Sequence, residues 1–68
     1  MISVNGEPRA DLAPGATVRA LLDALGADAD ARGIAVAVDA EVVPRAEWGT
    51  FAVADEARVE VLTAVQGG

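Results

Sequence analysis

The sequence closes on two glycines, Gly67 and Gly68, and we predict that the terminal glycyl carboxylate is its reactive group. Glycine has no Cβ, so a diglycine segment can thread a narrow channel in almost any backbone conformation and present a carboxylate to another protein's active site. Residues 58–65 come just before and alternate in hydropathy like a β-strand. We therefore expect a strand that leads into a flexible tail, residues 66–68, with a reach of roughly 10 Å. The alternative is an incidental frayed end.

The composition excludes most kinds of catalytic residue. The chain has 68 residues with no cysteine and no histidine, so it can form no disulfide, thiolate nucleophile or imidazole base. Its five basic residues are all arginines, and without a lysine it offers no side-chain amine as an acyl acceptor. We expect no catalytic residue and no metal site. The segment 28–33 resembles a calcium loop, but Arg32 stands where an oxygen ligand belongs.

The net charge indicates the kind of partner. At −6 the chain lacks the basic residues that displace counterions from nucleic acid, and it suits a basic surface on a protein partner. The N-terminal residues have no features of a signal peptide, and no apolar run approaches the roughly 18 residues that span a bilayer. We expect a cytoplasmic protein with no membrane association that is a monomer when free.

The first elements are a hairpin and a helix. Asn5-Gly6 follows a short alternating run and predicts a two-residue hairpin turn. The return strand, residues 7–12, contains Pro8 and should lie at a sheet edge. Thr17 is a plausible N-cap, and a helix over about 17–25 is predicted by apolar residues at helical spacing, namely Val18, Leu21, Leu22 and Leu25.

The second half of the chain indicates further strands. Residues 33–39 place Ile34, Val36 and Val38 on one face of a strand, and 39–41 form a turn before a short strand at 42–43. A helical turn is expected at 45–48, a short segment at 51–53, and the last strand at 58–65. The order β-β-α-β-β-β predicts an α+β fold in which a mixed sheet of about five strands packs on one helix, a β-grasp. We assign residues 1–65 to this single domain.

Three segments carry a resemblance to a known family, namely Gly33-Ile-Ala-Val-Ala-Val-Asp39, Glu41-Val-Val-Pro-Arg-Ala-Glu-Trp48, and the strand that ends in Ala64-Val-Gln-Gly-Gly68. They resemble the ThiS family, the sulfur carriers of thiamin-thiazole biosynthesis. The valine-proline-arginine segment with its following tryptophan is more discriminating than the diglycine. The sequence departs from the family at two turns. Asp39-Ala40 stands where the family often has asparagine-glycine, and Asp55-Glu56-Ala57 stands where aspartate-glycine-aspartate is frequent.

The resemblance implies a ubiquitin-like β-grasp and a reaction on Gly68. A ThiF-like enzyme would use Mg-ATP to adenylate the Gly68 carboxylate, and sulfur from donor machinery would then displace AMP to give a thiocarboxylate. A ThiG-like thiazole synthase would take the sulfur and return the carboxylate. ATP and magnesium would belong to the activating enzyme, with no cofactor bound by the carrier. Gly67 would provide steric clearance.

Two further residues are candidates for partner binding. Leu62 lies on the less apolar face of the last strand, where an exposed apolar side chain beside a working tail would mark an interface. The alternative is packing under the helix. Arg45 could pair with an acidic group of a partner, although a solvated or intramolecularly paired arginine is an equal alternative. We expect Trp48 to be a packing residue.

Other functions remain open from the sequence. A MoaD-like carrier for molybdopterin synthesis, or a carrier for cysteine or a secondary metabolite, would share the fold and the chemistry. A ubiquitin-like modifier would instead end in an isopeptide bond to a target lysine. In a β-grasp interaction module the diglycine would be incidental.

Overall fold

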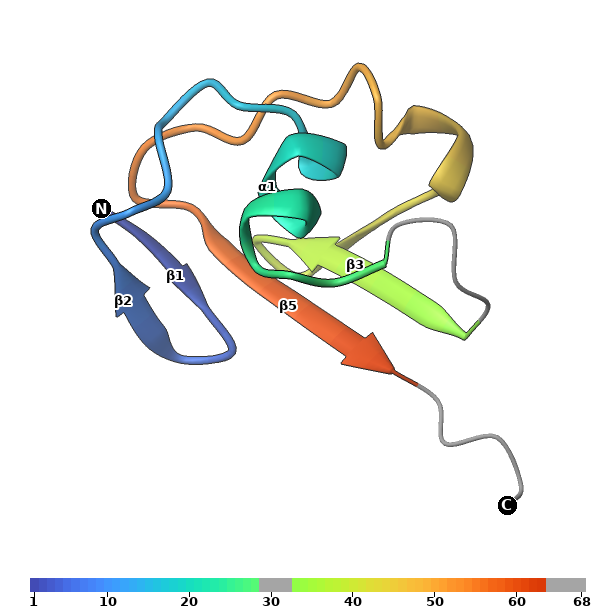
Figure 1. The fold of residues 1–68 in the computed structure, drawn as a ribbon, viewed down its shortest axis with the longest axis horizontal. Coiled ribbons are helices and arrows are strands. Elements are labelled where there is room, and N and C mark those ends of the chain that lie inside the picture. Colours follow the sequence, from blue (N-terminus) through green and yellow to red (C-terminus); the bar gives the residue numbers. More distant parts are fainter. Residues whose placement is uncertain (29–32, 64–68) are drawn as a thin grey trace.

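The computed structural model describes residues 1–28 and 33–63. Five strands form one mixed sheet in the order β2-β1-β5-β3-β4, and one helix lies across it (Figure 1). The parallel neighbours β1 and β5 are at the centre, as a β-grasp requires. The elements in chain order are β1 (Ile2–Val4), β2 (Glu7–Arg9), α1 (Val18–Ala24), β3 (Ile34–Val38), β4 (Glu41–Val43), the 3₁₀ turn η1 (Arg45–Glu47) and β5 (Arg58–Thr63).

The first hairpin turns as the sequence predicts. Asn5 and Gly6 have φ values of 50° and 85°, the left-handed conformation that a two-residue hairpin turn requires at both positions. Strand β2 is a sheet edge, which confirms the placement of Pro8. The expectation that β2 continues to Leu12 is wrong. Ile2, the first residue of β1, pairs with Arg9, so no partner remains beyond that point.

The helix is close to its predicted extent. Thr17 caps it, with the Thr17 Oγ1 accepting a hydrogen bond from the backbone N–H of Ala20 at 3.2 Å. Leu25 is the C-cap residue, and Gly26 follows at a φ of 77°. The buried stripe consists of Val18, Leu21 and Leu22, with Leu25 half-buried.

The turn between β3 and β4 repeats the geometry of the first hairpin with less suitable residues. Asp39 and Ala40 have φ values of 51° and 68°, and both of these lie in the left-handed region. This conformation costs a residue with a Cβ about 1–2 kcal/mol. The departure from asparagine-glycine therefore leaves the turn in place and makes it strained at Ala40.

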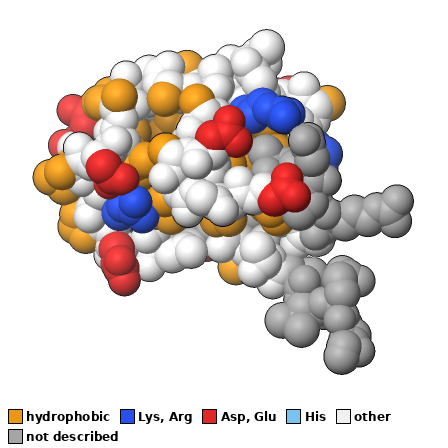
Figure 2. All heavy atoms as spheres, viewed as in Figure 1, with side chains coloured by type: hydrophobic (Ala, Val, Ile, Leu, Met, Phe, Trp, Pro, Cys, Tyr) orange, Lys and Arg blue, Asp and Glu red, His pale blue; other side chains and the backbone are white. Residues whose placement is uncertain are grey.

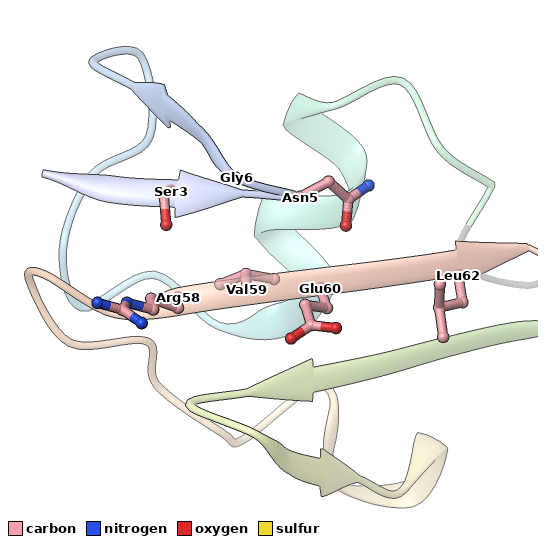
Figure 3. A pocket seen from close by; sticks show the side chains of 7 residues that line it. All are labelled: Ser3, Asn5, Gly6, Arg58, Val59, Glu60 and Leu62. Atoms are coloured by element: carbon pink, nitrogen blue, oxygen red, sulfur yellow. The ribbon is translucent and has the colours of Figure 1, made fainter.

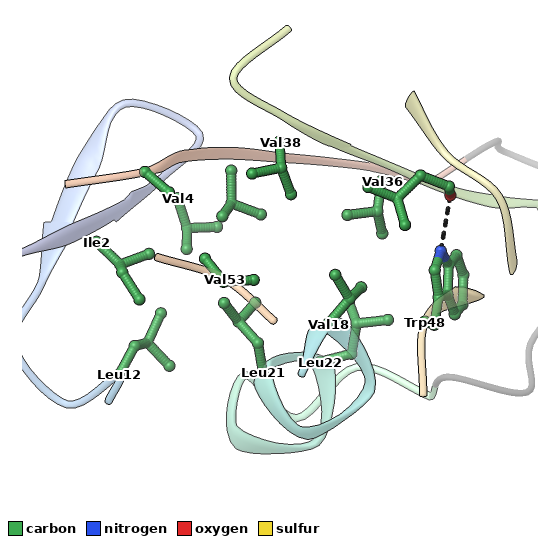
Figure 4. Packing of buried hydrophobic residues seen from close by; sticks show 13 residues of the cluster. Ile2, Val4, Leu12, Val18, Leu21, Leu22, Val36, Val38, Trp48 and Val53 are labelled. Carbon is green, nitrogen blue, oxygen red and sulfur yellow. Dashed lines mark hydrogen bonds between the residues drawn. The ribbon is translucent and has the colours of Figure 1, made fainter. Parts of the chain in front are cut away.

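The core lies between α1 and one face of the sheet (Figure 4). Alternation in β3 puts Val36 and Val38 on this face, together with Val59 of β5. Trp48 closes one end at 3% exposure, and its indole N–H donates to the carbonyl of Val43 at 2.9 Å. Trp48 is thus a packing residue, as expected.

The chain between η1 and β5 runs along the start of the helix. The expected segment at 51–53 is reduced to one bridge between Thr17 and Ala52, because the chain enters α1 directly after Thr17. Val53 is fully buried and its N–H donates to the carbonyl of Ala16 at 2.8 Å. The segment therefore contributes to the core without widening the sheet.

The predicted last strand is observed as Arg58–Thr63, and its expected continuation through residues 64 and 65 lies outside the described residues. Acidic and arginine side chains are interspersed on the face of the molecule in Figure 2. In the described part of the chain, no helix is long and apolar enough to cross a membrane.

Candidate functional site

The candidate site is the end of β5 and the sheet face beside it. Gly67 and Gly68, the predicted reactive tail, lie outside the described residues. The strand that leads toward them is central in the sheet and pairs with β3 from Val59 opposite Val38 to Thr63 opposite Ile34. On its other side β5 pairs with β1 at Arg58 and Val59, so its first half is paired on both sides.

Leu62 lies on the sheet face opposite the helix and is 64% exposed. It pairs with Ala35 of β3, and the next position on that face pairs Glu60 with Ala37. Val42 of the edge strand β4 pairs with Ala37 from the other side and is 72% exposed. The small alanines leave Leu62 and Val42 as raised apolar side chains. The alternative that Leu62 packs under the helix is therefore wrong.

A shallow hollow of about 670 Å³ lies beside Leu62 on this face. Figure 3 shows Ser3 on one side and Arg58, Glu60 and Leu62 along β5 on the other. The hollow exists because β1 ends at Val4 while β5 continues. Its hydroxyl, carboxylate, guanidinium and apolar groups suit contact with a polypeptide surface.

Arg45 lies apart from Leu62, since β3 separates β5 from β4 and Arg45 follows β4. Its guanidinium carbon is 4.6 Å from the centre of the Trp48 ring, a cation–π distance. The Arg45 side chain is exposed, whereas the Trp48 ring is buried. The structure thus gives Arg45 an intramolecular partner and does not bring the two predicted contact residues together.

Two turn residues contact the backbone of β5 in a way that the sequence did not predict. The Asn5 side chain accepts a hydrogen bond from the N–H of Val61 at 2.9 Å and donates to the carbonyl of Val61 at 3.2 Å. At the other end of β5, Asp39 Oδ1 accepts from the N–H of Arg58 at 2.9 Å. Both residues are an asparagine or aspartate at the first central position of a tight turn. This signal predicts the turn but does not indicate which distant strand the side chain contacts.

The described residues hold no cluster of three or more histidine, cysteine, aspartate or glutamate side chains arranged to bind a metal ion. Two exposed carboxyl groups have lowered pKa values. A hydrogen bond from the Arg9 guanidinium lowers the pKa of Asp11, and a hydrogen bond from the Met1 ammonium lowers the pKa of Asp55. Each carboxylate forms an ion pair with its partner, and neither lines the hollow beside Leu62.

Comparison with known proteins agrees with this geometry. The crystal structure of thiamine biosynthesis protein ThiS from Geobacter metallireducens superposes with a TM-score of 0.77 at 34% identity, covering 98% of this chain and 97% of that one. A solution structure of a thiamine biosynthesis protein from the same organism also has a TM-score of 0.77 at 34% identity, and the match covers 98% of this chain and 86% of that one. No curated protein sequence matches significantly. The sequence model of the ThiS family matches residues 2–68. The chain therefore belongs to the ThiS family of small sulfur carriers.

Proposed function

We propose that the protein carries sulfur as a thiocarboxylate on Gly68 for thiazole formation in thiamin biosynthesis. The observation that carries the proposal is the family match, which extends through both glycines to residue 68. The position of β5 supports it, because the strand that precedes the tail is central in the sheet and borders an exposed apolar surface at Leu62.

The reaction begins with activation of a poor electrophile. The Gly68 carboxylate attacks the α-phosphate of ATP on a ThiF-like enzyme, which supplies magnesium, and pyrophosphate leaves. The product is a mixed anhydride with AMP, a good leaving group. Hydrosulfide supplied by a donor attacks the acyl carbon, AMP leaves, and the product is the thiocarboxylate. A ThiG-like synthase then takes the sulfur and the carboxylate is restored.

The carrier contributes reach and docking to this sequence of steps. Leu62 and the adjoining alanines of β3 form an exposed apolar surface, and exposed apolar patches of this kind mark interaction sites. The carrier's net charge of −6 favours association with a basic surface on the activating enzyme. Arg45, stacked on Trp48, is a second proposed contact. We place the protein in the cytoplasm, where its ATP-dependent partner works.

The test is pyrophosphate release by a ThiF-type enzyme with Mg-ATP and this chain, compared with the chain lacking Gly68. We expect release with the intact chain and none with the truncated chain, whose fold should be unchanged by circular dichroism. Equal release from both would overturn the role of Gly68.

The pathway is tested separately. The sulfur-loaded chain is offered to a thiazole synthase and to the large subunit of a molybdopterin synthase, and we expect transfer only to the first. Transfer only to the second would favour the molybdopterin pathway. Adducts on target lysines that survive thiol treatment would favour a protein modifier.

A further inference from the structure

We propose that Asn5 is a positioning residue for the tail: its side-chain amide tethers the exit end of β5 and fixes the direction in which the chain leaves the sheet. This inference rests on the proposed function of the tail in so far as it concerns activation. The tether itself is a feature of the described residues.

The Asn5 side chain extends the hydrogen bonding between β1 and β5 past the point where the backbone of β1 ends. Strand β1 pairs with β5 in parallel, and the last register pair is Val4 with Val59. The N–H of Asn5 adds one more bond, to the carbonyl of Val59 at 2.9 Å. The chain then turns back into β2 at Gly6. Backbone from β1 therefore reaches β5 no farther than Val59.

The Asn5 side chain fills the next position of this ladder. Its carboxamide is a copy of a peptide group, with Oδ1 accepting from the N–H of Val61 and Nδ2 donating to the carbonyl of Val61. The orientation of the amide is fixed by chemistry, because the N–H of Val61 requires an acceptor and its carbonyl requires a donor. Figure 3 shows the side chain directed from the end of β1 toward β5.

The consequence concerns the distal half of β5. On its other side, β5 pairs with β3 as far as Thr63 opposite Ile34. On the β1 side, the Asn5 amide is the contact that the structure records beyond Val59 in the described residues. Without it, the end of β5 would have backbone pairing with β3 alone, and the half-buried Val61 side chain would be its remaining contact with the core. The strand end would then tilt more readily about β3.

A tilt at this point matters because of the length of chain that follows. Seven residues follow Val61, up to and including Gly68, and could extend over roughly 24 Å. A change of direction at Val61 would displace the point from which the tail starts, while Leu62 would keep its pairing with Ala35. A partner that docks on Leu62 would then bind the carrier with little change in affinity and receive the carboxylate less often.

The decisive variant is Asn5→Gly, since glycine accepts the positive φ of the turn and removes only the amide. The matched control is Asp39→Gly. It also replaces the first residue of a hairpin turn with positive φ, and it also removes a side-chain hydrogen bond to β5, but at Arg58, the end away from the tail. Both variants should lose similar stability, which thermal unfolding will verify.

The first readout is steady-state adenylation by a ThiF-type enzyme. We expect Asn5→Gly to lower kcat by about two- to tenfold, because one or two exposed hydrogen bonds that position the strand are lost. The KM for the carrier should stay within about twofold of the wild-type value. Asp39→Gly should leave both constants unchanged. A wild-type kcat in Asn5→Gly, or an equal fall in Asp39→Gly, would overturn the inference.

The second readout needs no enzyme. Amide hydrogen exchange of Val61 should be faster in Asn5→Gly and unchanged in Asp39→Gly, in which the amide of Arg58 should be the one that exchanges faster. Unchanged protection of Val61 in Asn5→Gly would overturn the tether. An inert wild-type carrier would count against the proposed function, and the exchange measurement would still decide whether Asn5 holds β5.

Discussion

The indole nitrogen of Trp48 donates a hydrogen bond to the carbonyl oxygen of Val43 at 2.9 Å within the core. Trp48→Phe keeps an aromatic ring, removes the indole donor and fills less of the core. We expect a loss of about 1–3 kcal/mol in the free energy of unfolding, from the lost hydrogen bond and the poorer packing, measured by urea denaturation followed by circular dichroism. Arg45→Ala is the comparison, because it removes an exposed side chain that stacks on the ring and should cost about 1 kcal/mol or less. Equal stability of Trp48→Phe and wild type would contradict this role of the indole.

Ala40 has a φ of 68° in the β3–β4 turn, where a Cβ is unfavourable. Ala40→Gly should raise the free energy of unfolding by about 1 kcal/mol, since the relief of strain exceeds the added entropy of the unfolded chain. The matched control is Ala37→Gly within β3. It makes the same chemical change in a strand and should lower stability. A fall in stability for Ala40→Gly would show that the turn is unstrained.

Leu62→Ser tests the docking surface. Because Leu62 is 64% exposed, we expect a change in unfolding free energy within about 0.5 kcal/mol. The KM for the carrier in adenylation should rise by about tenfold, as for an interface residue that contributes more than 1 kcal/mol. Val42→Ser is the control, because Val42 is also an exposed apolar residue, at 72%, but lies on the edge strand β4; it should have a smaller effect. An unchanged KM for Leu62→Ser would place the interface elsewhere.

The pair of Arg9 and Asp11 predicts a pH effect of known sign. The Arg9 guanidinium donates to both Asp11 oxygens, at 2.9 and 2.7 Å, and the pKa of Asp11 is lowered. A lowered folded-state pKa contributes stability above the unfolded value, near 3.9, and this contribution disappears as the pH falls through the folded value. Carbon-detected NMR titration should show the Asp11 pKa returning toward its ordinary range in Arg9→Met. The same pKa in both proteins would show that the pair does not form in solution.

Much of the fold could be predicted from local signals. Asn5-Gly6, the stripe of α1 and the alternation of β3 each depend on residues close in sequence, and all three are confirmed. The edge position of β2 followed from one property of Pro8, its missing N–H. From the sequence, Leu62 could be exposed or could pack under the helix. The structure shows that it is exposed, because α1 packs against the other face of the sheet.

What could not be predicted depends on pairing between distant segments. The end of β2 at Arg9 is set by where β1 begins, and the bridge at Ala52 is set by where α1 begins. The contact of Asn5 with Val61 joins residues that are far apart in sequence, and nothing in the local sequence of either indicates it. The same is true of the separation of Arg45 from Leu62 by β3.

The intact mass of the full chain tests the central claim most directly. The protein is incubated with a ThiF-type enzyme, Mg-ATP and a sulfide source, and the chain lacking Gly68 is treated in parallel. We predict that the intact chain gains the difference between the masses of sulfur and oxygen, once per molecule, and that the truncated chain gains nothing. An unchanged mass of the intact chain, with activating enzymes of the related pathways also giving no gain, would contradict the account.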